Sequence, residues 1–433
     1  MDQGNTAFLL FSAALVLLMT PGLAFFYGGL VKAKSVISMM MLSFGAIGLI
    51  GVLWVAYGYA IAFPTIGGTA PSPWLFDASN LFLDAAVADA AAPAGAYPTL
   101  AFVAFQATFA IITVALISGA IADRAKFGSW MLFAGLWATL VYFPVASWVF
   151  NFGLNIEGTD SYDPEAGVFS YGGWITNGLE DIFGVGAIDF AGGTAVHINA
   201  GAAALALALV LGKRVGFAKG AHVPHNPPFV LLGAGLLWFG WFGFNAGSEL
   251  AADGVAALAF INTIAAPAAA LLAWLIVEAI KDGKPTSVGA ASGAVAGLVA
   301  ITPACANLNP GWAIVLGLLA GALCALAVDL KFKLGFDDSL DVVGIHLVGG
   351  LIGTLFLGFF ANGTGLIYSG SFTQLLVQAI AAFAVMAYSF VVAYIIGFAI
   401  EKTIGFRVKV EDEIAGIDPI VHGEAGYVLD ATK

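Results

Sequence analysis

Long apolar segments recur along nearly the whole chain, and they restrict its fold more than any other feature. A helix rises ~1.5 Å per residue, so about 20 apolar residues cross the ~30 Å hydrocarbon core of a bilayer. Only 10% of the 433 residues are charged, whereas soluble domains carry about 25%. The sequence therefore predicts an all-α integral membrane protein.

Eleven segments are predicted to cross the membrane. They cover residues 6–31, 36–63, 98–122, 127–150, 189–212, 227–250, 255–280, 286–304, 312–332, 341–361 and 372–400. The first is too long for the core of a signal peptide and has no basic segment before it, so we expect it to be retained as a helix. The chain is predicted to divide into a transmembrane domain, 1–400, and a polar cytoplasmic tail, 401–433.

The basic residues predict the orientation of the chain. Eleven of the fifteen lysines and arginines lie in alternate connections between the spans, and the other four lie in the tail. The positive-inside rule makes this side cytoplasmic, with the N-terminus outside and the C-terminus inside. The opposite loops are acidic, either because they lack basic residues or because they attract cations to a pore mouth. The long outer connection 151–188 is a candidate cap over that mouth.

Two histidines, His197 and His346, lie inside the fifth and tenth predicted spans. An ionisable side chain in a membrane is costly and is a functional candidate, although hydrogen bonding between helices is an alternative role. An aspartate opens each of the two spans, Asp189 and Asp341 respectively. The two spans correspond if the first ten form an inverted 5+5 repeat, with the eleventh helix added. The pair predicts two imidazoles facing each other in a narrow pore.

Aromatic residues line two helix faces. Trp241, Phe244 and Ser248 are spaced i, i+3 and i+7, and Phe105 and Phe109 are spaced i and i+4, so each set shares a face. Aromatic rings beside a hydroxyl can hold a partly dehydrated monovalent cation. Ordinary aromatic packing, with the Ser248 hydroxyl bonded to its own helix, is the alternative interpretation.

Four long motifs occur in order along the chain. They are FYGGLVKAKSV (26–36), DFAGGTAVHINAG (189–201), GWFGFNAGS (240–248) and DDSLDVVGIH (337–346). The tail adds GFRV and IDPIVHGEAGY. Together they resemble the signatures of the Amt/Mep/Rh family of ammonium transporters, in its Amt branch. The resemblance implies a homotrimer with one pore in each subunit of eleven helices.

The resemblance also implies roles for single residues. His197 and His346 would be the paired pore histidines, and Phe109 and Phe244 the stacked rings that close the outer pore. Ser248 and Phe109 would recruit the substrate with an aromatic residue at the end of the fourth span. The residues predicted to support this site structurally are Asp189, Phe105, Trp241 and Asp341.

One position departs from the family pattern. Phe150 stands where a tryptophan is expected, and Trp148 lies two residues earlier on a different helix face. Phenylalanine still offers a π-face, but tryptophan binds cations better. We therefore expect weaker recruitment, or compensation by an aromatic residue of the long outer loop such as Trp174.

These features predict ammonium transport across the inner (plasma) membrane, with methylammonium as an analogue. Ammonium would lose a proton at the outer mouth, and ammonia would pass the histidines. The matched tail implies a PII-type regulatory protein as a cytoplasmic partner, and no cofactor, metal or nucleic acid is expected. An ammonium sensor is the alternative, but the tail is too short for a signalling domain. A membrane enzyme is a third reading, but two histidines are too few for a closed metal site.

Overall fold

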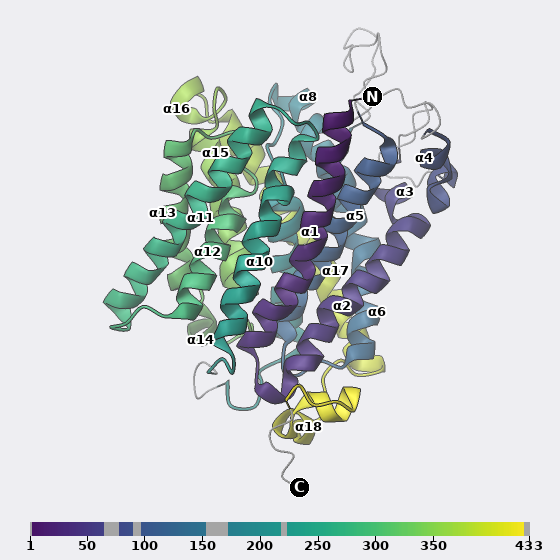
Figure 1. The fold of residues 1–433 in the computed structure, drawn as a ribbon, viewed down its shortest axis with the longest axis vertical. Helices are drawn as coiled ribbons and strands as arrows, with labels where there is room; N and C mark the ends of the chain where they lie inside the picture. The colour runs from purple at the N-terminus through teal and green to yellow at the C-terminus, as the bar shows by residue number, and fades with distance from the viewer. Residues whose placement is uncertain (1, 65–77, 90–96, 153–171, 218–222, 428–433) are drawn as a thin grey trace.

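The computed structural model describes residues 2–64, 78–89, 97–152, 172–217 and 223–427. Within these ranges the chain is helical, and its only β-type pairing is an isolated bridge between Ala125 and Arg407. The long helices form one bundle, and the two ends of the chain lie at its opposite ends (Figure 1).

Ten helices in the described part of the chain are long and apolar enough to cross a membrane. They are built from α1 (Gln3–Leu30), α2 (Val36–Leu53) with α3 (Tyr59–Ala62), α5 (Thr99–Ile117), α6 (Phe127–Trp137) with α7 (Phe143–Phe150), α9 (Asn199–Leu211), α10 (Pro227–Ala246), α11 (Gly254–Lys281), α13 (Pro310–Ala327) with α14 (Leu330–Leu334), α15 (Val348–Phe360) and α17 (Thr373–Thr403). Helix α12 (Ser287–Ile301) is apolar but shorter, and it occupies the place of the eighth predicted span. The all-helical membrane architecture is confirmed.

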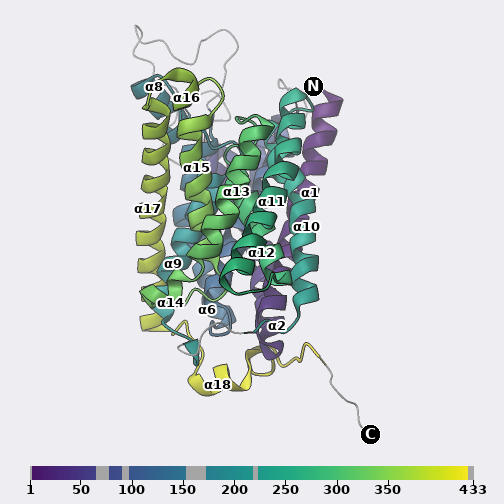
Figure 2. The ribbon, with the colours of Figure 1, turned by 90° about the vertical axis from the view of Figure 1, so that its left-hand side faces the viewer.

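Short helices cover the two ends of the bundle. Helices α8 (Leu179–Phe183) and α16 (Leu366–Ser369) lie at the end that holds the N-terminus (Figure 2). Helix α4 (Asp84–Asp89) lies at the same end, and α18 (Val410–Ala415) lies at the opposite end near the C-terminus (Figure 1).

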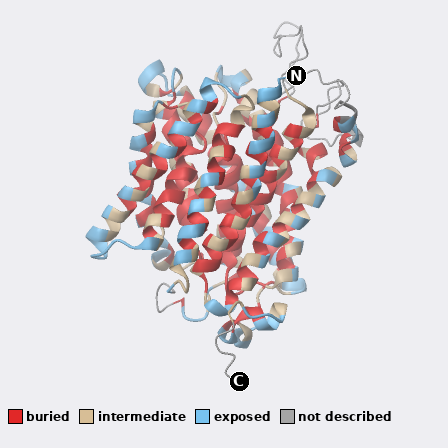
Figure 3. Ribbon diagram, in the orientation of Figure 1, coloured by how far each residue is buried: buried red, intermediate tan, exposed pale blue. Residues whose placement is uncertain are grey.

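Burial is concentrated between the helices, and many outward-facing positions are exposed (Figure 3). Large apolar side chains such as Phe11 and Leu272 are among the exposed ones, which suits a lipid-facing surface. Glycines bring α1 and α10 close together inside the bundle. A Cβ atom on Gly233 would lie 2.2 Å from the Phe26 nitrogen, and one on Gly240 would lie 2.3 Å from Met19 Cγ. Small residues are therefore required where these two helices cross.

Two of the π-helical turns in the described residues carry the membrane-embedded histidines: η7 (Gly193–Ile198) precedes α9, and η10 (Val343–Leu347) precedes α15. Asp189 stabilises the first turn, because its carboxylate accepts hydrogen bonds from the backbone of Thr194 and Ala195, both at 2.9 Å. Asp338 serves the second turn, accepting from the Val343 N–H at 2.7 Å.

Asp341, predicted to stand before His346 as Asp189 stands before His197, has a different role in the structure. Asp341 instead forms an ion pair with Lys331 at 2.5 Å. Its φ of +63° places it in the left-handed region, which aspartate tolerates better than most residues. The carboxylate that bonds to the second π turn belongs to Asp338.

The tail packs against the end of the bundle that holds the C-terminus. The Val408 N–H donates to the Arg124 carbonyl oxygen at 2.9 Å. The buried Asp418 carboxylate accepts from the N–H groups of Ile37 and Ser38, at 3.0 and 2.7 Å, at the start of α2. Unpaired N–H groups at a helix start favour such an anion. The boundary between the two predicted domains remains a prediction.

Candidate functional site

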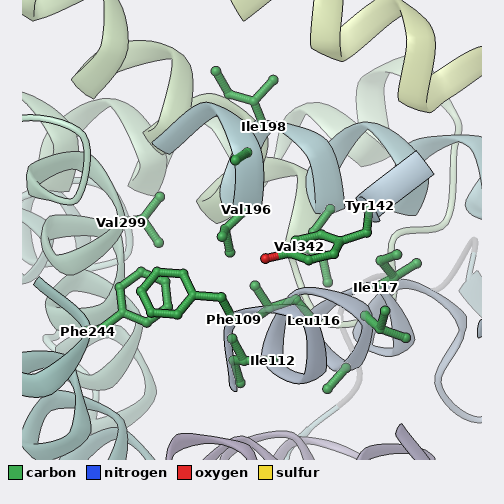
Figure 4. Packing of buried hydrophobic residues seen from close by; sticks show 14 of the residues in the cluster. Phe109, Ile112, Leu116, Ile117, Tyr142, Val196, Ile198, Phe244, Val299 and Val342 are labelled. Atoms are coloured by element: carbon green, nitrogen blue, oxygen red, sulfur yellow. The ribbon is translucent and has the colours of Figure 1, made fainter. Parts of the chain in front are cut away.

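Two phenylalanines form a face-to-face stack inside the bundle. The ring centroids of Phe109, on α5, and Phe244, on α10, lie 4.1 Å apart with an angle of 13° between the rings. Figure 4 shows this stack among apolar side chains that include Ile112, also on α5, and Val196 from the turn before α9. Phe105 packs on Phe109 with centroids 4.8 Å apart. Both stacked rings are almost completely buried, so they block any straight passage between α5 and α10.

A small cavity lies against the stack near Ser248, at the far end of α10. Its lining consists of Phe105, Gln106, Phe109, Phe150, Phe152, Phe190, Ser248 and Leu250. The cavity volume is about 10 Å³, close to the smallest volume that holds one water molecule. The three residues predicted to recruit the substrate therefore share one cavity.

The geometry of these three residues is compatible with a cation. The ring of Phe150 meets that of Phe109 edge to face, with centroids 6.0 Å apart. The Ser248 hydroxyl donates to the Phe244 carbonyl oxygen at 2.8 Å. The bond of Ser248 to its own helix, one of the alternatives from the sequence, is thus present. It uses the hydroxyl hydrogen and leaves a lone pair that can accept from a donor in the cavity.

A larger cavity of about 260 Å³ adjoins the small one and shares Phe152, Phe190 and Ser248 with it. Its wall also includes Asp189 and Asn307. The predicted cap over this side falls partly on residues 153–171, which lie outside the described residues.

Trp174 does not line the small cavity. Its ring packs on Trp148 with centroids 5.7 Å apart, and it is not part of the lining of either cavity. Trp148 in turn packs on Tyr388, at 4.8 Å. The aromatic residue that the outer connection 151–188 supplies to both cavities is Phe152.

The paired histidines lie on the other side of the stack. The Nδ1 atoms of His197 and His346 are 3.2 Å apart, and both side chains are buried. A hydrogen bond between two Nδ1 atoms requires one donor and one acceptor, which two neutral imidazoles of opposite tautomer supply. Trp241 stacks on His197 at 5.4 Å and donates to the Thr302 hydroxyl at 2.8 Å. Trp241 therefore fixes the plane of the His197 ring.

The cavity around the histidines is otherwise apolar apart from the Trp241 indole. Its remaining lining is Met19, Leu23, Phe26, Ile112, Leu116, Val196, Leu237, Trp241, Phe244 and Val295. Phe244 therefore separates this cavity from the region of Ser248. A small neutral molecule fits such surroundings better than an ion does, because a bare charge loses its hydration there.

Sequence reasoning missed two residues that the structure places at these sites. Gln106 lines the small cavity, and its position three residues before Phe109 could have indicated a shared helix face. Asp338 lies eight residues before His346, as Asp189 lies before His197. That equal spacing was the available signal for Asp338.

Among the described residues, ten apolar helices have membrane-crossing length and cavities lie on both sides of an aromatic stack, which is the architecture of a multi-pass membrane protein of the transport class. Comparison of sequences then identifies the family. The profile of the Ammonium Transporter Family matches residues 7–427, and the chain belongs to this family.

Relatives and solved structures agree with this assignment. The chain is 55% identical to an ammonium transporter of Mycobacterium tuberculosis over 449 residues, covering 98% of this chain and 90% of that protein. It is similar to the crystal structure of Candida albicans Mep2, with a TM-score of 0.80 and 28% identity over 100% of this chain and 95% of that one. A solved chain described as a sensor Amt protein has a TM-score of 0.83 and 27% identity, covering 97% of this chain and 98% of the other.

Proposed function

We propose that this protein carries ammonium across the plasma membrane by stripping it of a proton at the outer mouth and conducting ammonia past a histidine pair. Family membership supports ammonium as the substrate. The single observation that carries the proposal is the spatial order of three features beside α10. Ser248 lies in a small cavity with aromatic walls, the Phe109–Phe244 stack follows, and His197 and His346 lie beyond it.

Recruitment is the first step of the proposed mechanism. The rings of Phe109 and Phe150 attract the positive charge, and the Ser248 oxygen accepts an N–H hydrogen bond. Because the cavity holds about one small particle, ammonium enters it with most of its water removed. Loss of water disfavours the charged form of an amine, so ammonium gives one proton to water on the outer side and becomes ammonia.

Conduction is the second step. The Phe109–Phe244 stack must move to admit ammonia, which makes these two rings a gate. Beyond it, ammonia reaches an apolar cavity in which His197 and His346 offer donors and acceptors. Three residues support this arrangement. Asp189 bonds to the π turn before α9, and Phe105 packs on the gate ring of Phe109. Trp241 stacks on the imidazole of His197.

The proposed topology has eleven spans, with the N-terminus outside and the C-terminus inside. The two ends of the chain lie at opposite ends of the bundle, which supports an odd number of crossings (Figure 1). In the described part of the chain ten helices meet the length for a full span, and in this proposal the shorter apolar α12 is the eleventh crossing. The basic connections and the tail then face the cytoplasm.

Assembly and regulation follow from the family resemblance. We expect a homotrimer in the lipid bilayer, with one pore per subunit. A PII-type protein is the expected partner at the end of the bundle where the tail docks. A pull-down with purified PII protein, with and without nucleotide effectors, tests this partner.

Transport is favoured over sensing because relatives at 55% and 42% identity are named ammonium transporters. Uptake of methylammonium, and growth of cells on limiting ammonium, test the proposal directly. The matched control is the double variant His197→Asp/His346→Ala, which keeps the rest of the bundle. Wild-type uptake no greater than that of this control would contradict transport.

A further inference from the structure

The small cavity beside the Phe109–Phe244 stack contains a polar side chain that the proposed mechanism has not used. Of its eight lining residues, only Gln106 and Ser248 carry polar side chains. Gln106 is 5% exposed, and its side-chain oxygen is buried without a hydrogen-bond partner. A buried acceptor without a partner is unfavourable, so the Gln106 oxygen is free to accept a hydrogen bond from a donor that enters the cavity.

The position of Gln106 on α5 places it beside the gate. It precedes Phe109 by three residues, which puts the two on one face of the helix. The side chain of Thr108, between them in sequence, bonds to the Phe105 carbonyl oxygen at 2.6 Å and does not line the cavity. Of Gln106 and Thr108, only Gln106 therefore presents a polar side chain to the small cavity.

Ammonium has four N–H donors and no acceptor, so a site for it needs oxygen acceptors as well as aromatic faces. Ser248 supplies one, because its hydroxyl hydrogen is already bonded to Phe244. An amide supplies a second, since its carbonyl oxygen turns toward the cavity by rotation of the side-chain amide. A neutral acceptor holds the cation without forming an ion pair that would trap it.

We propose that Gln106 is a recruitment residue that accepts a hydrogen bond from ammonium in the cavity it shares with Ser248, Phe109 and Phe150. This inference rests on the proposed function. It also offers a compensation for Phe150 that differs from the one expected of Trp174. The second acceptor strengthens a site whose aromatic wall is weaker in π-attraction than tryptophan would make it.

The test compares Gln106→Leu, which removes the amide at similar size, with Gln106→Glu, which keeps the shape and adds a negative charge. Purified full-length proteins are reconstituted in liposomes, and initial rates of ammonium and methylammonium transport are measured over a range of concentrations. Thr108→Val is the matched control on the same helix. Protein amount and elution volume in size-exclusion chromatography establish that each variant is folded.

We expect Gln106→Leu to raise the half-saturating concentration of ammonium about tenfold, with a maximal rate within about twofold of wild type. Gln106→Glu should lower the half-saturating concentration and also the maximal rate, because the cation is held too tightly. Thr108→Val should match wild type. A purely structural role for Gln106 would instead lower the yield or the maximal rate without this split.

Two results would overturn the inference, and they are distinguishable. If wild type transports ammonium and both Gln106 variants keep its half-saturating concentration within about twofold, the inference alone fails. If the wild-type protein moves no ammonium, the proposed function fails and takes the inference with it. Should Gln106→Leu not fold, Gln106→Glu decides the matter, since an unchanged half-saturating concentration in that variant contradicts the role.

Discussion

Asp189 and Asp338 have the same relation to the paired histidines, because each lies eight residues before one of them. Each carboxylate also bonds to backbone N–H groups of the π-helical turn that carries its histidine. The correspondence is what the predicted inverted repeat requires. It also indicates that the histidine positions depend on carboxylates at opposite ends of the bundle.

The first prediction concerns Asp189→Ala. Its carboxylate accepts from Gly192, Thr194 and Ala195, so the variant leaves three buried N–H groups without partners. Each orphaned group costs about 1–3 kcal/mol, and we expect a total loss of at least about 3 kcal/mol in stability. The measurement is the thermal unfolding temperature in detergent. Asp282→Ala, at an exposed carboxylate, is the control, and equal unfolding temperatures for the two variants would contradict the prediction.

The second prediction concerns pH. Burial raises the pKa of Asp338, which lies between two spans, to about 6, although the charge of Lys331 opposes the shift. The folded protein therefore binds more protons than the unfolded chain between about pH 4 and pH 6. The contribution of Asp338 to stability is present below about pH 4 and is lost as the pH rises through about 6.

Asp338→Asn tests this dependence, because asparagine stays neutral and keeps an oxygen for the Val343 N–H. We expect the variant to unfold at a higher temperature than wild type near pH 7 and at a similar temperature near pH 4. Unfolding is followed in detergent at both pH values. A difference in unfolding temperature that does not change with pH would argue against a raised pKa at Asp338.

The third prediction uses the hydrogen bond between His197 and His346. Each single alanine variant should lower the transport rate at least about tenfold, because it removes one of two coupled polar groups in an apolar cavity. The double alanine variant should be slower than either single one by no more than about threefold. Initial rates of methylammonium uptake by wild type, both single variants and the double variant, at equal protein amounts, form a double-mutant cycle. Multiplicative losses would show that the two rings act independently.

The fourth prediction addresses Phe150. Phe150→Trp should lower the half-saturating concentration of ammonium about threefold to tenfold, because the indole attracts cations more strongly. Phe150→Leu keeps an apolar side chain, lacks a π-face, and should raise that concentration. Concentration-dependent transport in liposomes measures both. Equal values for the leucine and tryptophan variants would remove Phe150 from the recruitment site.

The fifth prediction concerns docking of the tail. The buried Glu413 carboxylate accepts from Arg407 and from the Val215 N–H, both at 2.6 Å. Glu413→Ala leaves the Val215 N–H and the partly exposed Arg407 guanidinium without this partner, a loss of about 1–3 kcal/mol. Hydrogen exchange of the tail should accelerate while that of the long helices stays unchanged. Glu411→Ala, at an exposed position on the same helix, should exchange as wild type does.

Much of the fold was predictable because each span must satisfy its backbone within one helix and present apolar side chains to lipid. The same constraint drew attention to His197 and His346, since imidazoles rarely occur in such helices without a role. The stacked pair Phe109 and Phe244 came from the family resemblance. Helical spacing relates residues on one helix only, so it does not show which rings meet between α5 and α10.

What escaped sequence reasoning depends on backbone detail. Asp341 was matched with Asp189 because each opens its predicted span, whereas in the structure Asp341 has a left-handed conformation and the carboxylate that bonds to the second π turn is that of Asp338. Gln106 was not predicted, because a single glutamine in a span can bond to a neighbouring helix as readily as it can face a ligand. Only its unpaired oxygen in an aromatic cavity distinguishes the two cases.

The close crossing of α1 and α10 has a consequence for how a solute can cross. These are the first helices of the two proposed halves, and Gly233 and Gly240 bring their backbones nearly into contact. Transporters that work by alternating access rock one half against the other. Such a motion would have to separate the closely packed backbones of α1 and α10. We therefore expect the two halves to keep their relative position during each turnover. Movement would be confined to side chains, so that the protein works as a channel and not by alternating access.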